Sequence, residues 1–272
     1  MQIIFYEQVE STNILALDMA RQGAPPKTVV WAGRQSGGRG QYGRSFASPP
    51  GGLYFSLLLE PNLPLARLPM VTLAAGVGCA RALEQMCGLA VLLKWPNDLV
   101  YVRPARSQPD NRGLLPLCCP GMRDGGDGNG KKLGGILTEG VPARQGESQR
   151  VVVGVGINVN SRPADFSSRL STRLTSVYAE SGREFVLEPL LESCCRAILE
   201  QAALLQHQPD KLLALWDARD YCKGRRLSWE SGAELITGTG QGIMADGRYC
   251  LESEDGSLHA IQAGRIRPLE EI

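Results

Sequence analysis

The sequence predicts an α+β protein in two parts, a strand-and-helix body over residues 1–222 and a small all-β domain over residues 223–272. Up to about residue 220, apolar runs of strand length alternate with longer segments of helical periodicity. After Tyr221, short apolar runs alternate with Gly and Asp turns, and the Asp-Gly pairs at 246–247 and 255–256 are typical of β-hairpins. Hydrophobic residues make up 43% of the 272 residues, which is enough for a packed core.

The first strand and helix carry short local signals. Residues 3–6 are expected to form a strand, and residues 28–32 form the next one. Between them, Ser11 or Thr12 can cap the start of a helix, because hydroxyl oxygens accept hydrogen bonds from the first free backbone N–H groups. Gly23 is expected to end that helix.

The middle of the body contains a loop, a buried strand and a long helix. Glycine and arginine dominate residues 35–44, and the apolar run 53–59 is a buried strand. Residues 65–87 form a long helix in which alanine and glycine allow close packing. Residues 91–102 form a strand that bends or lies at a sheet edge, since Pro96 has no N–H to donate to a ladder.

The segment 103–130 differs in kind from its neighbours. It contains four prolines and six glycines, and we expect a surface insertion there. Strands follow over 133–139 and 151–159, and two helices follow over about 188–206 and 209–219.

Composition excludes several classes of protein. A net charge of +1 leaves no basic field for DNA, and no apolar run reaches the roughly 20 residues of a membrane span. Residues 1–10 lack the basic and apolar regions of a signal peptide, so a cytoplasmic protein is expected. The eight cysteines contain no CxxC pair, so we expect free thiols that fill core space rather than a zinc site.

The loop 35–44 is the first segment suited to chemistry. Four glycines within residues 37–43 let the backbone approach a ligand closely. Arg39 and Arg44 place guanidinium groups beside it, which suit a carboxylate or a phosphate. The glycine spacing fits neither a P-loop nor a dinucleotide-binding motif, and a solvated flexible loop is the alternative.

Two further segments place cations next to oxygen ligands or glycines. Lys94 can hold a phosphate, and Asp98, with Asn97, can hold a magnesium ion. Lys132 comes just before Gly134-Gly135 in an apolar strand, where glycines often mark the close approach of a ligand. The alternative for the segment 94–98 is an ordinary strand end with a solvated lysine. The alternative for Lys132 and the two glycines is a charged strand start followed by a bulge.

The fourth segment is the apolar strand 151–159, which contains Gly154-Val155-Gly156 and Asn158. A buried amide without partners is costly. An asparagine can read an adenine edge, because it has both a donor and an acceptor. A structural asparagine that bonds neighbouring backbone is the alternative.

Together and in this order, these segments resemble the motifs of biotin protein ligases. The resemblance covers the chain from about residue 8 to the C-terminus, apart from the insertion at 103–130. The matching segments are Ser11-Thr12-Asn13, Gly38-Arg39-Gly40 with Gly43-Arg44, Lys94-Trp95-Pro96-Asn97-Asp98, Lys132-Leu133 with Gly135-Ile136-Leu137, and Gly154-Val155-Gly156-Ile157-Asn158.

The resemblance implies a fold and a reaction. The fold is a catalytic domain similar to class II aminoacyl-tRNA synthetases, a mixed sheet with flanking helices, followed by an SH3-like barrel. The reaction uses ATP and Mg²⁺ to form biotinyl-5′-AMP, and then transfers biotin to a lysine of a carrier, usually the biotin carboxyl carrier protein of acetyl-CoA carboxylase. The first motif starts at Ser11, so no DNA-binding domain is expected, and whether the protein is a homodimer stays open.

The resemblance also implies roles for individual residues. The expected catalytic residues are Lys94, Lys132 and Arg44. The expected biotin-binding residues are Ser11, Thr12, Asn13, Gln35, Gly38, Arg39, Gly40, Gln41, Lys132 and Gly135. The expected ATP-binding residues are Arg39, Arg44, Lys94, Asn97, Asp98, Gly156 and Asn158. Asp98 is also expected to bind the magnesium ion that ATP carries.

The chain departs from the family pattern at three places. Gln41 stands where many members have an arginine, and Phe46 where they have a tryptophan. We expect weaker retention of the adenylate, since the loop loses one positive charge. Arg265 stands where an acidic residue often follows the glycine, which leaves the role of the C-terminal domain in closing over ATP less secure.

Two other functions compete with this interpretation. A lipoate or octanoate ligase has a related catalytic domain but lacks this glycine–arginine loop. A protein that senses biotin without ligating it is the other alternative, against which Lys94, Asp98 and Lys132 argue. Release of pyrophosphate from ATP when biotin is added separates a sensor from a ligase.

Overall fold

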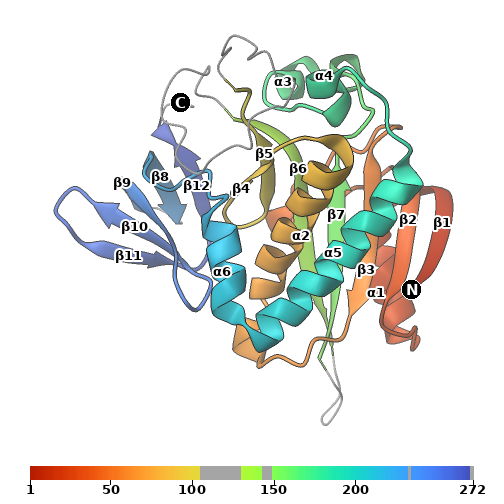
Figure 1. Cartoon of the computed structure of the whole chain (residues 1–272), viewed down its shortest axis with the longest axis horizontal. Helices are drawn as coiled ribbons and strands as arrows, with labels where there is room; N and C mark the ends of the chain where they lie inside the picture. Colours follow the sequence, from red (N-terminus) through yellow and green to blue (C-terminus); the bar gives the residue numbers. More distant parts are fainter. Residues whose placement is uncertain (105–129, 143–148, 232–233, 270–272) are drawn as a thin grey trace.

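A computed structural model describes residues 1–104, 130–142, 149–231 and 234–269. The body is a seven-stranded sheet in the order β1-β2-β3-β7-β6-β5-β4 (Figure 1). β1 and β2 are parallel, and the other neighbours are antiparallel, so the predicted mixed sheet is confirmed. The strands are β1 (Gln2–Val9), β2 (Thr28–Gln35), β3 (Leu53–Leu59), β4 (Leu92–Lys94), β5 (Asp98–Tyr101), β6 (Lys131–Val141) and β7 (Arg150–Ile157).

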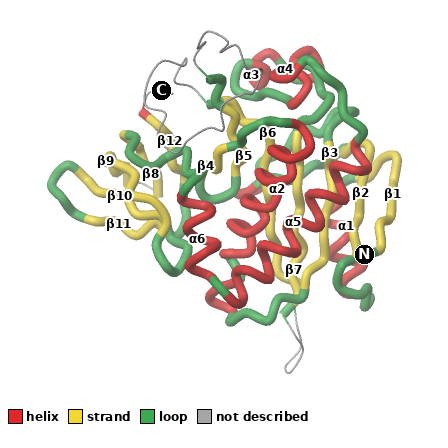
Figure 2. The backbone as a smooth tube through the Cα atoms, in the orientation of Figure 1, coloured by secondary structure: helices red, strands yellow, loops and turns green. Residues whose placement is uncertain are grey.

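Helices cover both faces of this sheet (Figure 2). α2 (Met70–Cys87) and α5 (Leu187–His207) pack on one face, and α1 (Thr12–Arg21) packs on the other. Leu57 belongs to the core under α2 and α5, whereas Leu58 packs with α1. Successive side chains of a strand point to opposite faces. Because both faces are covered, every residue of β3 is buried, as the apolar run predicts.

The close contact between α2 and α5 depends on small residues. A Cβ atom at Gly78 would lie 2.8 Å from the backbone nitrogen of Ile198, so only glycine fits there. The predicted close packing is confirmed, but the predicted start at residue 65 is wrong, since residues 65–67 form a 3-10 helix. An α-helix from residue 65 would need a hydrogen bond from the nitrogen of Pro69, which carries no hydrogen.

The other predicted elements of the body agree in type with the structure. The strand expected over 91–102 is broken into β4 and β5, a hairpin in which Lys94 lies opposite Asp98, and β4 lies at the sheet edge. β7 ends at Ile157, so Asn158 lies one residue beyond the strand. The short helices α3 (Ser168–Ser171) and α4 (Val177–Ser181) were not predicted. Residues 105–129 of the predicted insertion lie outside the described residues.

The C-terminal part is a five-stranded antiparallel sheet in the order β11-β10-β9-β8-β12. Its strands are β8 (Arg226–Ser231), β9 (Glu234–Ile243), β10 (Tyr249–Ser253), β11 (Leu258–Ile261) and β12 (Arg265–Pro268). The Asp-Gly pairs at 246–247 and 255–256 lie in the turns of two hairpins, as predicted. This sheet lies beside β4 and α6 (Pro209–Asp217) (Figure 1). Trp95 donates from Nε1 to the carbonyl oxygen of Gly247, 3.1 Å away.

The junction between the two sheets contains a buried carboxyl group. Asp220 accepts hydrogen bonds from the backbone nitrogen of Cys222, at 2.8 Å, and from the hydroxyl of Tyr249, at 2.9 Å. Burial raises the pKa of Asp220 to about 7, although both hydrogen bonds act to lower it. The first residues after α6 are therefore bonded directly to the C-terminal sheet.

Two expectations from composition bear on the described part of the chain. In those ranges no helix combines the length and apolar character that crossing a membrane requires. Cys79, Cys87, Cys194 and Cys195 are buried free thiols on α2 and α5, which confirms their predicted place in the core.

Candidate active site

A cavity of about 760 Å³ brings the predicted segments together. The residues that line it come from the segments 11–13, 35–46, 94–100, 130–137, 154–156, 170–174 and 264–267, together with Tyr221. Antiparallel pairing aligns Asp98 with Gly135, and Gly135 with Gly156, across β5, β6 and β7. Fourteen of the sixteen predicted site residues line this cavity, whereas Gly38 and Asn158 do not.

The start of α1 forms the neutral end of the cavity. The backbone nitrogen of Thr12 donates to Oε1 of Gln35 at 2.8 Å, and the Thr12 hydroxyl lies 3.2 Å from the same oxygen. Ser11 occupies the N-cap position, yet its side chain accepts no capping hydrogen bond. The predicted hydroxyl cap is therefore wrong: the amide of Gln35, from the end of β2, satisfies the helix start instead.

The side-chain amide of Asn13 forms hydrogen bonds with three other residues of the protein. Its Nδ2 donates to the carbonyl oxygen of Leu137 at 3.1 Å and to Oε2 of Glu139 at 2.8 Å. Its Oδ1 accepts from the hydroxyl of Ser56 at 2.6 Å. A Cβ atom at Gly154 would lie 1.9 Å from Oδ1 of Asn13, so the glycine in β7 provides the space for this side chain. Asn13 thus fixes the wall of the neutral end.

Sequence reasoning missed Ser56 and Glu139 in this network. Ser56 is fully buried in β3 and lies 2.8 Å from the hydroxyl oxygen of Thr12. A serine inside the otherwise buried apolar run 53–59 was the available signal, because a buried hydroxyl requires a partner. Glu139 carried no such signal, since a charged residue near the end of a strand is ordinary.

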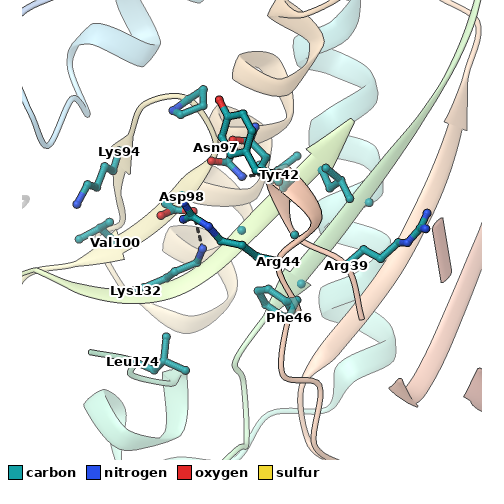
Figure 3. A pocket seen from close by; sticks show the side chains of 18 of the residues that line it. Arg39, Tyr42, Arg44, Phe46, Lys94, Asn97, Asp98, Val100, Lys132 and Leu174 are labelled. Atoms are coloured by element: carbon teal, nitrogen blue, oxygen red, sulfur yellow. Dashed lines mark hydrogen bonds and ion pairs between the residues drawn. The ribbon is translucent and has the colours of Figure 1, made fainter. Parts of the chain in front are cut away.

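The charged end of the cavity centres on an ion pair between β5 and β6. Nζ of Lys132 lies 2.6 Å from Oδ1 of Asp98, and the side chains are 33% and 28% exposed, within reach of a ligand (Figure 3). A Cβ atom at Gly135 would lie 3.3 Å from Nζ of Lys132 and 3.6 Å from Oδ1 of Asp98. Gly135 therefore leaves space for the pair, as expected for a glycine beside a ligand site.

Lys94 and Asn97 flank this pair. Nζ of Lys94 lies 5.8 Å above the ring of Tyr221. Nδ2 of Asn97 donates to the carbonyl oxygen of Ile136 at 2.9 Å, which ties the turn after β4 to β6. Among the described residues no group of three or more His, Cys, Asp or Glu could hold a metal ion, and Asp98 is the one acidic residue in the cavity wall.

Residues 38–44 form a tight hairpin beside the cavity. The backbone nitrogen of Gly40 donates to the carbonyl oxygen of Arg44 at 2.7 Å, and Phe46 pairs in the same way with Gly38 at 2.8 Å. A Cβ atom at Gly38 would lie 2.4 Å from the carbonyl oxygen of Phe46, so this glycine permits the hairpin to close. Figure 3 shows Arg44 directed toward Asp98 and Lys132, whereas Arg39 extends away from them.

Phe46 and Gly156 form a further piece of the wall. A Cβ atom at Gly156 would lie 2.5 Å from the ring of Phe46, so the ring packs directly on the backbone of β7. Nζ of Lys132 lies 6.0 Å from the centre of the same ring. Because Gly156 has no side chain, the ring of Phe46 can pack directly on β7, beside Lys132.

Asn158 lies outside the cavity wall. It is 2% exposed, and its Nδ2 donates to the carbonyl oxygen of Thr175 at 2.9 Å. Its Oδ1 is buried without a hydrogen-bond partner among the described residues. This geometry agrees with the structural alternative, in which the amide ties the end of β7 to the segment before α4.

The wall also contains residues that sequence reasoning did not assign to the site. Tyr42, Arg173 and Arg267 line the cavity, as do Gly264 and Arg265, which were discussed only as a departure from the family. Basic side chains far outnumber the single carboxylate of the wall, so the cavity suits a polyanion. The basic residues in the wall are Arg39, Arg44, Lys94, Lys131, Lys132, Arg173, Arg265 and Arg267.

Comparison with known proteins agrees with this geometry. A family model described as "Biotin/lipoate A/B protein ligase family" matches residues 5–158. The chain is 28% identical over 256 residues to the bifunctional ligase/repressor BirA of Bacillus subtilis, across 93% of this chain and 70% of that protein. It is 27% identical over 262 residues to BirA of Escherichia coli, across 95% of this chain and 71% of that protein.

A solved structure matches the whole fold. The biotin protein ligase from Aquifex aeolicus, in complex with biotin and ATP, superposes with a TM-score of 0.77 at 25% identity. The match covers 98% of this chain and 99% of the Aquifex chain, so it includes the C-terminal sheet as well as the body. Because the family model covers more than half of the sequence, the chain belongs to the biotin/lipoate A/B protein ligase family.

Proposed function

We propose that this protein is an ATP-dependent biotin protein ligase that forms biotinyl-5′-AMP and transfers biotin to a lysine of the biotin carboxyl carrier protein of acetyl-CoA carboxylase. The observation that carries the proposal is a single cavity with a neutral hydrogen-bonding end, at Thr12 and Gln35, and a basic end, at Lys94 and Lys132. Its volume of about 760 Å³ lies within the usual range of ligand pockets.

Biotin has the same division into a neutral and a charged end. Its ureido ring is neutral and needs donors and acceptors, and its carboxylate needs cations. We propose that the ring binds near the start of α1 and that the carboxylate lies beside Lys132. The proposed biotin-binding residues are Ser11, Thr12, Asn13, Gln35, Arg39, Gly40, Gln41, Lys132 and Gly135, with Gly38 shaping the hairpin.

In the first step an oxygen of the carboxylate attacks the α-phosphorus of ATP, and pyrophosphate leaves. Two anions about 3.5 Å apart repel by roughly 5 kcal/mol at an effective dielectric constant near 20. Lys94, Lys132 and Arg44 offset this repulsion and stabilise the charge that develops on the phosphoryl oxygens. Arg44 suits the role because Figure 3 shows it directed toward Lys132.

In the second step the amine of a carrier lysine attacks the mixed anhydride, and AMP leaves. We propose that the nucleotide occupies the wall formed by Arg39, Arg44, Lys94, Asn97 and Gly156, and that Asn158 supports it from behind through Thr175. Asp98 would bind a magnesium ion together with the phosphates of ATP, because one carboxylate plus phosphate oxygens suits that ion. Bound there, magnesium would neutralise phosphate charge.

We also infer the finer features of the fold from the family resemblance. The body, residues 1–222, is related to class II aminoacyl-tRNA synthetases, and the sheet of residues 223–272 is an SH3-like barrel. The five antiparallel strands of the C-terminal sheet support that relationship.

A transfer assay tests the proposed function. The purified protein is incubated with ATP, magnesium, biotin and a carrier domain, and the carrier mass is measured, with octanoate and lipoate in parallel. We expect a mass gain matching biotin that is lost in Lys94→Ala and Lys132→Ala and kept in Lys211→Ala, which changes an exposed lysine on α6. A gain with octanoate or lipoate alone would assign the protein to the lipoate branch, and biotin binding without transfer would indicate a sensor.

A further inference from the structure

We propose that Ser56 is a positioning residue that fixes the direction of the Thr12 hydroxyl proton, so that the neutral end of the cavity presents a hydrogen-bond acceptor and selects a ligand ring with an N–H donor. The inference rests on the proposed function, which places the ureido ring of biotin near the start of α1. Ser56 is fully buried in β3 and does not line the cavity, so it acts through Thr12.

A carboxylate and a carbonyl oxygen orient the side-chain amide of Asn13. Its Nδ2 lies 2.8 Å from Oε2 of Glu139 and 3.1 Å from the carbonyl oxygen of Leu137. Both of these oxygens only accept, so the NH₂ group of the amide has to face them. The opposite orientation would place Oδ1 of Asn13 against two acceptors. Oδ1 is therefore fixed on the side of β3, where it faces Ser56.

The single hydroxyl proton of Ser56 goes to Asn13. Oγ of Ser56 lies 2.6 Å from Oδ1 of Asn13 and 2.8 Å from Oγ1 of Thr12. The amide oxygen only accepts, so Ser56 donates to it, at the shorter of the two distances. Because Ser56 is fully buried, neither a ligand nor solvent competes for this proton. Ser56 therefore has only its lone pairs left for Thr12.

Thr12 in turn donates to Ser56. The other acceptor within its reach, Oε1 of Gln35, lies 3.2 Å from Oγ1 and already accepts from the backbone nitrogen of Thr12 at 2.8 Å. The Gln35 amide is held in this orientation because its Nε2 donates to Oγ of Ser48 at 2.8 Å. Whichever of the two oxygens accepts it, the Thr12 proton points into the protein. Thr12 lines the cavity, so it offers a ligand a lone pair and no proton.

An acceptor at the neutral end selects ligands that carry an N–H donor. Each ring nitrogen of a ureido group carries a hydrogen and can donate to Thr12. A dithiolane ring or an alkyl chain has no such donor, so its burial would leave the Thr12 oxygen without a partner. Sites that are built to hydrogen-bond a ligand group strongly reject analogues that lack it. Ser56 therefore acts on specificity, although it does not touch the ligand.

Two cyclic carbamate analogues of biotin test the direction of the Thr12 proton. In each analogue a ring oxygen replaces one of the ureido N–H groups, so the shape is kept while a donor becomes an acceptor. Calorimetry on the full chain without ATP gives the dissociation constants of biotin and of both analogues. We expect the wild type to bind the analogue whose ring oxygen faces Thr12 at least about 100-fold less tightly than biotin, because two acceptors then meet.

Ser56→Ala leaves Thr12 only the longer contact with Gln35, so the hydroxyl can turn and donate to the ring oxygen of the carbamate. The ratio of the carbamate and biotin dissociation constants should therefore fall at least about tenfold, whereas a merely structural role would weaken both ligands equally. Thr12→Val should also lower the ratio, and adding Ser56→Ala to it should cause no further change. As a control, Thr28→Val removes another buried hydroxyl, which donates to the carbonyl oxygen of Pro25 at 2.7 Å, and should keep the wild-type ratio.

The inference is overturned if the Ser56 variant keeps the wild-type ratio, or if the wild type binds both carbamates as tightly as biotin. Thermal melting establishes that each variant is folded, and Ser56→Cys, whose thiol is a weak donor and a weak acceptor, replaces Ser56→Ala if the alanine variant does not fold. The biotin-transfer assay, run in parallel, separates the two conclusions. Biotin transfer with a ratio that the Ser56 variant leaves unchanged rejects the inference alone. A ratio that falls as expected, in a protein that transfers no biotin, rejects the proposed function alone.

Discussion

Gly154→Ala should break the neutral end of the cavity. A Cβ atom at this position would lie 1.9 Å from Oδ1 and 2.6 Å from Cγ of Asn13, so the asparagine side chain has to leave its place. It then loses its hydrogen bonds to Leu137, Glu139 and Ser56.

Each of these three bonds contributes about 1 kcal/mol net, and an extra methyl group in a packed site costs about 1–3 kcal/mol. We therefore expect the free energy of unfolding to fall by about 4–6 kcal/mol and the melting temperature to fall by roughly 10–20 °C. Biotin affinity, measured by calorimetry, should fall at least about tenfold, which corresponds to about 1.4 kcal/mol.

Gly140→Ala is the matched control for this substitution. Gly140 lies in the neighbouring strand β6 with an ordinary backbone, and a Cβ atom there meets nothing within 4 Å. The free energy of unfolding of the Gly140→Ala variant should differ from that of the wild type by less than about 1 kcal/mol. The double variant Asn13→Ala/Gly154→Ala should be no less stable than Asn13→Ala alone, because the clash is gone. If Gly154→Ala behaves like Gly140→Ala, or if the two effects simply add, the assigned role of Gly154 is incorrect.

Three further changes test other parts of the molecule. The pKa of Asp220, about 7 in the folded protein against 3.8 as its ordinary value, means that the folded state keeps a proton which the unfolded state loses. Stability should therefore fall as the pH rises from 4 to 7, by at most about 4 kcal/mol. In denaturant titrations at pH 5 and pH 8, Asp220→Asn should reduce the difference in the free energy of unfolding between the two pH values. The same difference in the variant and the wild type would refute the role assigned to Asp220. Gly135→Ala pushes on the Lys132–Asp98 pair from 3.3 Å, and kcat/KM for biotin transfer should fall about tenfold with little change in melting temperature; a large loss of stability would contradict this. Gln41→Arg adds a cation to the hairpin and should slow adenylate release, whereas equal release rates would show that position 41 does not retain the intermediate.

Local patterns were sufficient for most of the fold. The run 53–59 is apolar except at Ser56, and β3 has those bounds. All of its residues are buried because helices cover both faces of the sheet. Pro96 divides a strand, and the two Asp-Gly pairs make hairpins, because these signals act on the backbone next to them. The helix expected from residue 65 begins at Met70 instead. The reason is equally local, since Pro69 has no N–H to donate.

The family resemblance carried by the ordered motifs also predicted which segments meet, but it did not determine how each side chain is used. Gln35 caps α1 from 23 residues away, and Gly154 makes room for Asn13 from 141 residues away. Asn158 has the composition of a ligand contact, yet it faces Thr175 behind the cavity wall. Gly264 meets the hydroxyl of Tyr42 only through the packing of the C-terminal sheet on the body. Such contacts depend on the direction of each side chain and on the spacing between strands, and therefore only the tertiary structure decides them.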